Sequence, residues 1–373
     1  MCTWGALETI GYFLRNGSNV FTCLMDNSKA FDKVKFSLLF RKLFLTSLPI
    51  IFIRILFFIY LNQSANIRWN SEFTDVFRIS NGIRQGAILS GILYCFYNTK
   101  LTEILEESGV GCWVDGEYCG VWSYSDDTFL IAPSLEALQK MLNICEYYAK
   151  SHNLVFSTDP DPIKCKTKCL AFLKKPRELN QMILCNNPLP WVSEGLHLGH
   201  SISNKYDGMK SDILQKRGKF IQRNCELLQE FGHCHPKLKF KVNQIYNSSF
   251  TGSPLWGLFS KQADMFEKSW NVSVRNMFGL PLSTHRYFIE PISESLHLKA
   301  ILIQRFLSFI SKIKKGKKNK LKHILRIVER DTRSTTGNNL RQILLLTEHC
   351  DIEDLSPSDA QSITYKSIDD EDQ

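Results

Sequence analysis

Residues 21–32 read Phe-Thr-Cys-Leu-Met-Asp-Asn-Ser-Lys-Ala-Phe-Asp, and residues 122–131 read Trp-Ser-Tyr-Ser-Asp-Asp-Thr-Phe-Leu-Ile. Asp26 follows an apolar, β-prone stretch, and the pair Asp126–Asp127 interrupts another, so we expect these carboxylates at rigid positions that reach solvent. Carboxylates from two strands that meet form a hard oxygen site of the kind that Mg²⁺ prefers. Because Asp-Asp alone also suits a plain hairpin turn, the surrounding sequence must decide between these interpretations.

A glycine-containing segment lies between the two acidic signals. Residues 80–90 read Ser-Asn-Gly-Ile-Arg-Gln-Gly-Ala-Ile-Leu-Ser, and an apolar run follows them to Tyr97. Gly82 and Gly86 permit close approach of the backbone, and Arg84 and Gln85 offer hydrogen-bond donors beside them. Alone, this segment would indicate an ordinary turn. Three such segments in this order form a far more specific signal than any one of them.

The order Asp-x-Ser-Lys-Ala-Phe-Asp, Gly-Ile-Arg-Gln-Gly-x-x-Leu-Ser and Tyr-x-Asp-Asp resembles that of reverse transcriptases. More narrowly, it is similar to the polymerase of non-LTR (LINE-type) retrotransposons in the jockey/CR1-like range. The resemblance covers roughly residues 1–300 and continues through further segments, which are 152–156, 164–172, 196–199, 252–256 and 280–285. It implies a reverse transcriptase with a polymerase palm and a helical thumb.

The resemblance also implies roles for individual residues. Asp26 and Asp126 match the metal-binding aspartates, and Asp127 is their neighbour, so the three form the expected metal site for two Mg²⁺ ions, with Mn²⁺ as an alternative. Phe31 matches the bulky side chain that excludes ribonucleotides by contact with the 2′-hydroxyl. Lys166 matches a lysine that protonates the leaving pyrophosphate. The predicted catalytic residues are therefore Asp26, Asp126, Asp127 and Lys166.

Other matched positions would contact the substrates. Arg84, Gln85 and Gly86 fall in the segment that contacts the incoming nucleotide and the template. Leu198-Gly199 falls where the family places the hairpin that grips the primer end. Lys164 and Lys168 are alternatives to Lys166 for the pyrophosphate.

The chain departs from the family pattern at three positions and at its start. Asn27 replaces an apolar residue, Ser125 stands where the family mostly has Ala, and Gly91 stands where it mostly has Pro. None of these changes removes a carboxylate. Because only 25 residues precede Asp26, the resemblance implies a truncated copy that lacks the upstream fingers region and an endonuclease domain.

Residue patterns predict an α+β fold with the βαββαβ order of a ferredoxin-like polymerase palm, followed by a helical thumb. The expected domains are a palm with partial fingers at 1–200, a helical thumb or connection at 201–325, and a carboxy-terminal helix with an acidic tail at 326–373. Within the last of these, residues 351–373 are expected to be disordered. The palm strands are expected at 20–25, 118–124, 128–132, 154–157 and 168–173, and its helices at 88–107 and 134–151. Thumb helices are expected near 209–223, 236–250, 261–278 and 285–315.

Composition is that of a globular protein that favours polyanionic partners. The 373 residues carry a net charge of +9, and 44% of them are hydrophobic. Twelve cysteines and no visible signal peptide indicate reduced thiols in the nucleus and/or cytoplasm, and no secretion. The apolar run Leu43–Leu61 is interrupted by Pro49 and Arg54, which predicts two buried helices on the back of the palm sheet and no membrane partner.

Three functions agree with these patterns. The first is an RNA-directed DNA polymerase whose partners are an RNA template with a DNA primer and a deoxynucleotide (dNTP). The second is a catalytically dead remnant that only binds nucleic acid, and the third is another palm enzyme such as a nucleotide cyclase. The basic block Lys312–Lys322 contacts phosphates, acts as a nuclear import signal, or forms a charged linker. The sequence leaves the oligomeric state open.

Overall fold

The computed structural model describes residues 1–247, 250–347, 349 and 351–363. The chain divides into two compact units: one comprises Gly17–Gly195, and the other comprises Thr3–Asn16 together with the chain from Leu196 onward. Helix α1 (Cys2–Arg15) therefore groups almost entirely with the second unit. This division differs from the expected first domain at residues 1–200, because contacts far apart in the sequence assign the amino-terminal helix elsewhere.

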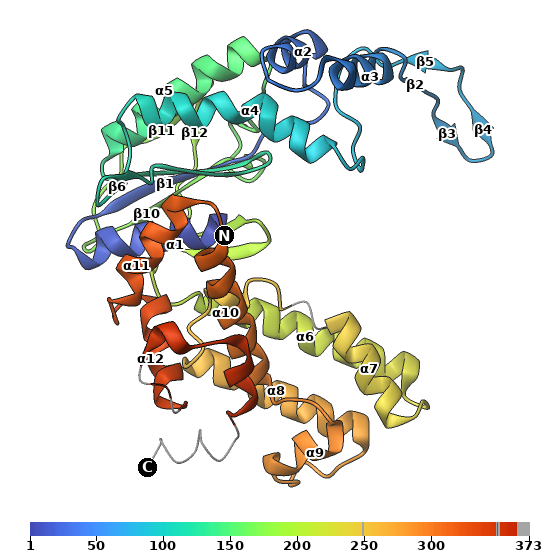
Figure 1. Ribbon diagram of the computed structural model, residues 1–373, viewed down its shortest axis with the longest axis vertical. Helices are drawn as coiled ribbons and strands as arrows, with labels where there is room; N and C mark the ends of the chain where they lie inside the picture. The colour runs from blue at the N-terminus through green and yellow to red at the C-terminus, as the bar shows by residue number, and fades with distance from the viewer. Residues whose placement is uncertain (248–249, 348, 350, 364–373) are drawn as a thin grey trace. The chain divides into compact units, whose positions relative to one another are not determined.

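A four-stranded antiparallel sheet forms the centre of the first unit (Figure 1). Its strands are β1 (Val20–Met25), β8 (Val121–Tyr124), β9 (Asp127–Ala132) and β10 (Lys168–Phe172), in the spatial order β10-β1-β9-β8. Helix α4 (Ser90–Glu107) lies in the chain between β1 and β8, and helix α5 (Leu135–His152) lies between β9 and β10. This order confirms the predicted βαββαβ palm with its split βαβ arrangement.

The register of the sheet explains how its core forms. Phe21 pairs with Ala132 and Ala171, and Cys23 pairs with Leu130 and Cys169, and all of these side chains are buried in one core. Because side chains alternate across a strand, these pairs share one face of the sheet. Helices α4 and α5 cover this face (Figure 1), with Leu93, Tyr97, Leu138 and Leu142 among their buried side chains.

Two further helices follow β1, as the break at Pro49 predicted. Helix α2 spans Phe36–Phe44, and helix α3 spans Ile50–Leu61. The expectation that both are buried against the sheet is wrong for α3, because only Ile53, Leu56 and Tyr60 are buried there. Helix α3 packs against α2 through this single stripe. Among the described helices, none combines the length and the apolar character needed to span a lipid bilayer.

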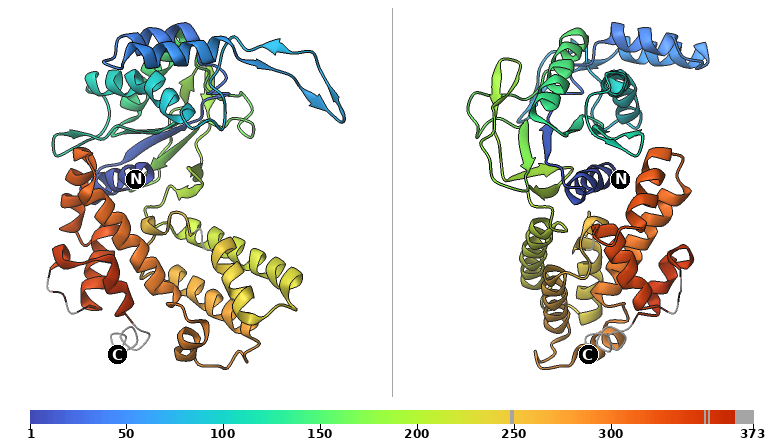
Figure 2. Two further views of the ribbon diagram at one scale, coloured as in Figure 1. Left: turned by 45° about the vertical axis from the view of Figure 1, so that its right-hand side comes forward. Right: turned by 90° about the vertical axis from the view of Figure 1, so that its left-hand side faces the viewer.

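The remaining strands of the chain form short two-stranded ribbons. After α3, a long hairpin extends away from the helices (Figure 2) and pairs β2 (Ser64–Ala65) with β5 (Phe77–Arg78) and β3 (Arg68–Trp69) with β4 (Glu72–Phe73). The other ribbons are β6 (Trp113–Val114) with β7 (Glu117–Tyr118), β11 (Met182–Leu184) with β12 (Asn187–Leu189), and β13 (Glu194–His197) with β14 (His200–Ser203).

Apart from the β13–β14 hairpin at its start, the described part of the second unit from Leu196 onward is mainly helical, as predicted for a thumb. Its longer helices are α6 (Lys210–Phe231), α7 (Pro236–Asn247), α8 (Lys261–Phe278), α10 (Leu298–Lys315), α11 (Asn319–Glu329) and α12 (Thr335–Leu345). The expected helix at 285–315 is wrong, because it is divided into a 3-10 turn at Arg286–Phe288, α9 (Ile289–Ser293) and α10. Glu294 ends α9 with a φ of +52°, and the His297 ring accepts a hydrogen bond from Ala300 N to begin α10.

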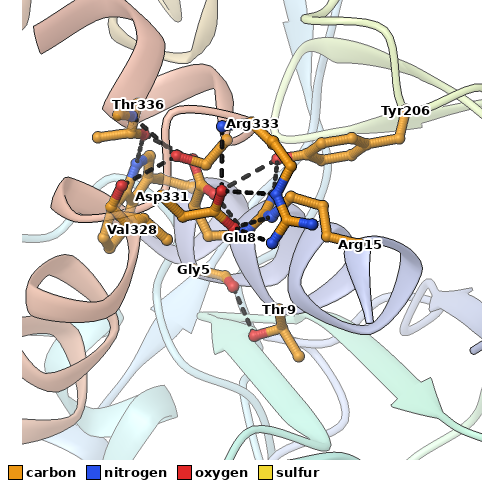
Figure 3. Close-up of polar contacts among 12 residues, drawn as sticks. Gly5, Glu8, Thr9, Arg15, Tyr206, Val328, Asp331, Arg333 and Thr336 are labelled. Atoms are coloured by element: carbon orange, nitrogen blue, oxygen red, sulfur yellow. Dashed lines mark hydrogen bonds and ion pairs between the residues drawn. The ribbon is translucent and has the colours of Figure 1, made fainter. Parts of the chain in front are cut away.

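Buried polar contacts fix α1 in the second unit (Figure 3). The Glu8 carboxylate accepts hydrogen bonds from the hydroxyls of Thr336 and Tyr206, and burial raises its pKa. Arg15 donates to Asp331 at 2.8 Å and to Tyr206 at 3.1 Å. These partners lie far along the chain, so no local sequence pattern specifies the position of α1.

The carboxy-terminal segment is ordered over much of its length. Two 3-10 turns, Ile352–Asp354 and Pro357–Gln361, follow α12, and the second packs against α10. Ala360 and Ile363 are buried, and His297 Nε2 lies 3.0 Å from the carbonyl oxygen of Ile363. The expectation of a disordered tail at 351–373 is therefore wrong for residues 351–363, because these few apolar side chains are enough to attach the segment. Residues 364–373 lie outside the described part.

Candidate active site

The antiparallel register brings the acidic signals together at one end of the sheet. Strand β1 ends at Met25, which pairs with Thr128 of β9. Continuing this register by one residue places Asp26 opposite Asp127, and by two residues places Asn27 opposite Asp126. A hydrogen bond of 3.0 Å from Asn27 Nδ2 to the carbonyl oxygen of Asp126 agrees with this continuation. All three carboxylates are half-buried.

Backbone contacts fix Asp26 from its other side. Ser157 N donates to the carbonyl oxygen of Asp26 at 2.8 Å, and the hydroxyl of Thr167 accepts from Asp26 N at 3.3 Å. The expected strand at 154–157 is wrong, because only an isolated bridge joins Asn27 and Phe156. The segment still contributes Leu154 and Phe156 to the buried core, and its Ser157 N contacts the backbone of Asp26.

Asp126 lies at the tip of the hairpin between β8 and β9. Tyr124 pairs with Asp127, which leaves Ser125 and Asp126 as a two-residue turn. Ser125 has a φ of +57°, in the left-handed region that a side chain with a Cβ seldom adopts. Such strain costs on the order of 1–3 kcal/mol and concentrates at functional sites. The tight turn holds the Asp126 carboxylate at the same end of the sheet as Asp26.

The charges of this cluster interact. Burial, together with the neighbouring Asp126 and Asp26 carboxylates, raises the pKa of Asp127 to about 6. Within the described residues, no ion pair joins any of the three aspartates to a cationic side chain. The same part of the chain has no three His, Cys, Asp or Glu side chains that could hold a metal ion as they stand. Mutual repulsion opposes closer approach of the carboxylates.

Asn27, a departure from the family pattern, links the acidic cluster to Phe31. Its Nδ2 atom also donates to the Tyr94 hydroxyl at 3.3 Å. The Tyr94 ring stacks on Phe31, with ring centroids 5.0 Å apart and planes 30° from parallel. Burial and the Asp126 charge raise the pKa of Tyr94, so its hydroxyl stays protonated. Our sequence reasoning missed Tyr94, since nothing in the apolar run 88–97 distinguishes it from a core aromatic.

The glycine segment packs against the chain that carries Phe31. Gly82 N donates to Val34 O at 2.9 Å, and Ile83 N donates to Phe31 O at 2.8 Å. Gly82 has a φ of +91°, and a Cβ there would lie 3.1 Å from Asp32 Cα, so glycine is needed for this approach. The next three residues, Arg84, Gln85 and Gly86, are all exposed. The residues predicted to contact the nucleotide are therefore accessible to solvent. They directly follow Ile83, which is hydrogen-bonded to the Phe31 backbone.

The predicted lysine directly precedes a residue that contacts the Asp26 backbone. Lys166 is exposed and precedes Thr167, whose hydroxyl contacts Asp26 N. Lys164 Nζ lies 3.8 Å from a carboxylate oxygen of Asp161. Lys168 lies in β10 opposite Leu24. The choice of Lys166 over these two lysines stays a prediction.

Leu198 and Gly199 form the turn of the β13–β14 hairpin. Their φ angles are +49° and +77°, as in the tight primed turns that connect two antiparallel strands. Lys216 Nζ donates to the carbonyl oxygen of Gly199 at 3.0 Å. The predicted primer-gripping segment is thus a hairpin, and its contact with the primer stays a prediction.

Comparison with known proteins identifies the same family. The family model "Reverse transcriptase (RNA-dependent DNA polymerase)" matches residues 6–201. A Retrovirus-related Pol polyprotein from type-1 retrotransposable element R2 of Nasonia vitripennis is 26% identical over 192 residues. These residues are 51% of this chain and 18% of the relative, so the chain spans less than a fifth of the curated protein that it matches. The narrower jockey/CR1-like placement stays a prediction.

Two solved telomerase structures, each in complex with the TWJ fragment of telomeric RNA, are also similar to the chain. The structure from Candida tropicalis has a TM-score of 0.40 and 13% identity, and covers 86% of this chain and 51% of its own. The one from Candida albicans has a TM-score of 0.38 and 10% identity, and covers 88% and 54%. The family model spans more than half of the chain. The chain therefore belongs to the reverse transcriptase family.

Proposed function

We propose that this chain is an RNA-directed DNA polymerase that extends a DNA primer on an RNA template. The observation that carries the proposal is the strand register that brings Asp26, Asp126 and Asp127 to one end of the palm sheet. In the proposed reaction, the primer 3′-hydroxyl oxygen bonds to the α-phosphorus of a dNTP, the bond from that phosphorus to the bridging oxygen breaks, and pyrophosphate leaves.

The three aspartates would hold two Mg²⁺ ions, or Mn²⁺ ions in their place. Their carboxylate oxygens are hard donors, their charges repel one another, and among the described residues no cation offsets them, so the donor set suits a divalent cation. When bound, such ions supply electrostatic stabilisation of the transferring phosphoryl group. The backbone contacts to Asp26 and the turn at Ser125 hold the carboxylates in place before any ion binds.

The other predicted residues would orient the substrates. Phe31, supported by its stack on Tyr94, presents a fixed ring edge that excludes a 2′-hydroxyl. Arg84 and Gln85, with the open backbone at Gly86, contact the incoming nucleotide and the template. Lys166 donates a proton to the departing pyrophosphate.

The test is extension of a labelled DNA primer on an RNA template by the purified chain. We expect extension with dNTPs and Mg²⁺, and loss of extension in the Asp126→Ala variant. Glu107→Ala provides a matched control, because it removes an exposed carboxylate at the far end of α4. That control should extend the primer at the wild-type rate. Binding of the template–primer, measured by gel shift in a chelator, should be the same for all three proteins.

Two outcomes would contradict the proposal. Extension that persists in Asp126→Ala would show that these carboxylates do not perform the chemistry. A wild-type chain that shifts the template–primer but never extends it would instead support a nucleic-acid-binding remnant.

A further inference from the structure

A groove between α6 and α8 in the second unit is the strongest unassigned feature of the molecule. Its volume is about 320 Å³. This volume would hold roughly ten water molecules at about 30 Å³ each, which is also about the number of heavy atoms in one nucleobase. It lies within the range of small-ligand sites and is far too small for a duplex. All of its lining residues belong to this one unit.

The sides of the groove are apolar and partly open. Phe220 is buried at its base, and Ile221 and Val272 line it from α6 and α8 with exposures of 38% and 42%. Apolar side chains that flank a narrow groove suit a flat, unsaturated ring, since such a ring gains both burial and dispersion contacts.

Two buried polar groups in the lining lack partners. Asn224 is 6% exposed and Ser273 is 2% exposed, and both line the groove. Within the described residues, Asn224 Oδ1 and Ser273 Oγ have no hydrogen-bond partner. An unsatisfied buried polar atom costs about 1–3 kcal/mol, so a bound molecule with polar ring edges would relieve this cost.

Two cationic side chains line the same groove. Arg217 Nε donates to Ser269 Oγ at 2.7 Å and to Met265 O at 3.2 Å, which holds the guanidinium against α8. Lys268 is exposed, lines the same groove, and forms no ion pair within the described residues. A phosphate attached to a ring in the groove would find both charges nearby.

We infer that this groove binds a single nucleotide, with its base between Ile221 and Val272 and its phosphate near Arg217 and Lys268. The apolar sides, the unpartnered polar groups and the flanking cations each match one part of that ligand. The site is separate from the aspartate cluster, which lies in the other unit. The inference therefore stands or falls independently of the polymerase activity.

Cys225 makes the inference directly testable, because this exposed cysteine lines the groove. The full chain would be labelled with N-ethylmaleimide, and modification of each cysteine would be followed by mass spectrometry. At a concentration of AMP ten times its dissociation constant, we expect labelling of Cys225 to slow about tenfold, because only the free groove reacts. Cys95, an exposed cysteine of the first unit, is the internal control and should react at an unchanged rate.

Two further comparisons separate the base from the phosphate and the groove from other sites. Ribose 5-phosphate, which lacks a base, should leave Cys225 unprotected. Val272→Trp should fill the groove and abolish protection by AMP. Ile245→Trp, a matched change at an exposed position of α7, should preserve it.

The inference is overturned if AMP, CMP, GMP and UMP all leave Cys225 unprotected, which would mean that water alone fills the groove. It is equally overturned if ribose 5-phosphate protects as well as AMP does, since the site would then be a simple anion site. Protection that survives in Val272→Trp would place the ligand elsewhere.

Discussion

The raised pKa of Asp127 predicts that this aspartate destabilises the metal-free chain at neutral pH. Its pKa rises from an ordinary 3.8 to about 6, so the folded state binds the proton more tightly than the unfolded state. The stability that protonated Asp127 contributes to the folded state is therefore fully present below the unfolded pKa of this group. It is lost as the pH rises through the folded pKa. Asp127→Asn removes the titration while keeping the shape of the side chain.

The size of the effect follows from the shift. At about 1.4 kcal/mol for each pKa unit, the full shift corresponds to about 3 kcal/mol. Because the side chain is half exposed and solvent screens its charge, we expect about 1 kcal/mol to be measured. The unfolding free energy of Asp127→Asn minus that of the wild type should therefore increase by about 1 kcal/mol as the pH rises from about 4 to about 7.

Urea unfolding at both pH values, in a chelator, measures this difference. Glu107→Gln, which changes an exposed carboxylate of α4, is the control and should follow the wild type. Added Mg²⁺ at neutral pH should stabilise the wild type more than Asp127→Asn, since the cation offsets the repulsion among the carboxylates. The reasoning is refuted if the free-energy difference between wild type and Asp127→Asn is the same at both pH values.

Two other predictions concern the second unit. Gly11→Ala should lower the unfolding free energy by about 1–3 kcal/mol in urea unfolding, because its Cβ would lie 2.4 Å from the Tyr206 ring. Gly218→Ala in α6 is the control, because a Cβ there would meet no atom within 4 Å, and its unfolding free energy should instead rise by up to about 1 kcal/mol. Equal effects of the two changes would contradict the packing of α1 against Tyr206. Ile363→Ala should cost about 2 kcal/mol or more in the same measurement, because Ile363 is 1% exposed. An unchanged stability in Ile363→Ala would mean that the segment 351–363 does not pack in solution.

The sequence could predict the palm because its strands carry their own signals. Asp26 directly follows β1 and Asp127 begins β9, and the ferredoxin-like order places β1 antiparallel between β9 and β10. Once this order is known, the register of Met25 with Thr128 fixes which acidic residues meet. The glycine segment was equally readable, because Gly82 adopts a backbone conformation that other residues seldom do.

The position of α1, the exposure of α3 and the packing of residues 351–363 could not be predicted, because they depend on contacts between distant parts of the chain. Glu8 bonds to Thr336, which lies 328 residues later, and no local pattern in α1 specifies that partner. The apolar character of α3 suggested burial, whereas only Ile53, Leu56 and Tyr60 of this helix are buried. The tail at 351–363 looked polar overall, and the few side chains that attach it are a minority of its composition.

Asn27 shows how a departure from a family pattern is accommodated at the site itself. An apolar residue at this position could not donate to Asp126 O or to the Tyr94 hydroxyl, and both bonds hold the Asp126 turn and the Phe31 support together. The contacts that position Asp26 are likewise neutral, from Ser157 N and the Thr167 hydroxyl. Neutral groups therefore hold the aspartates in place, and among the described residues no side-chain cation neutralises them. A cluster built in this way retains its negative charge for a divalent cation, and such retained charge distinguishes an ion site from a structural salt-bridge network.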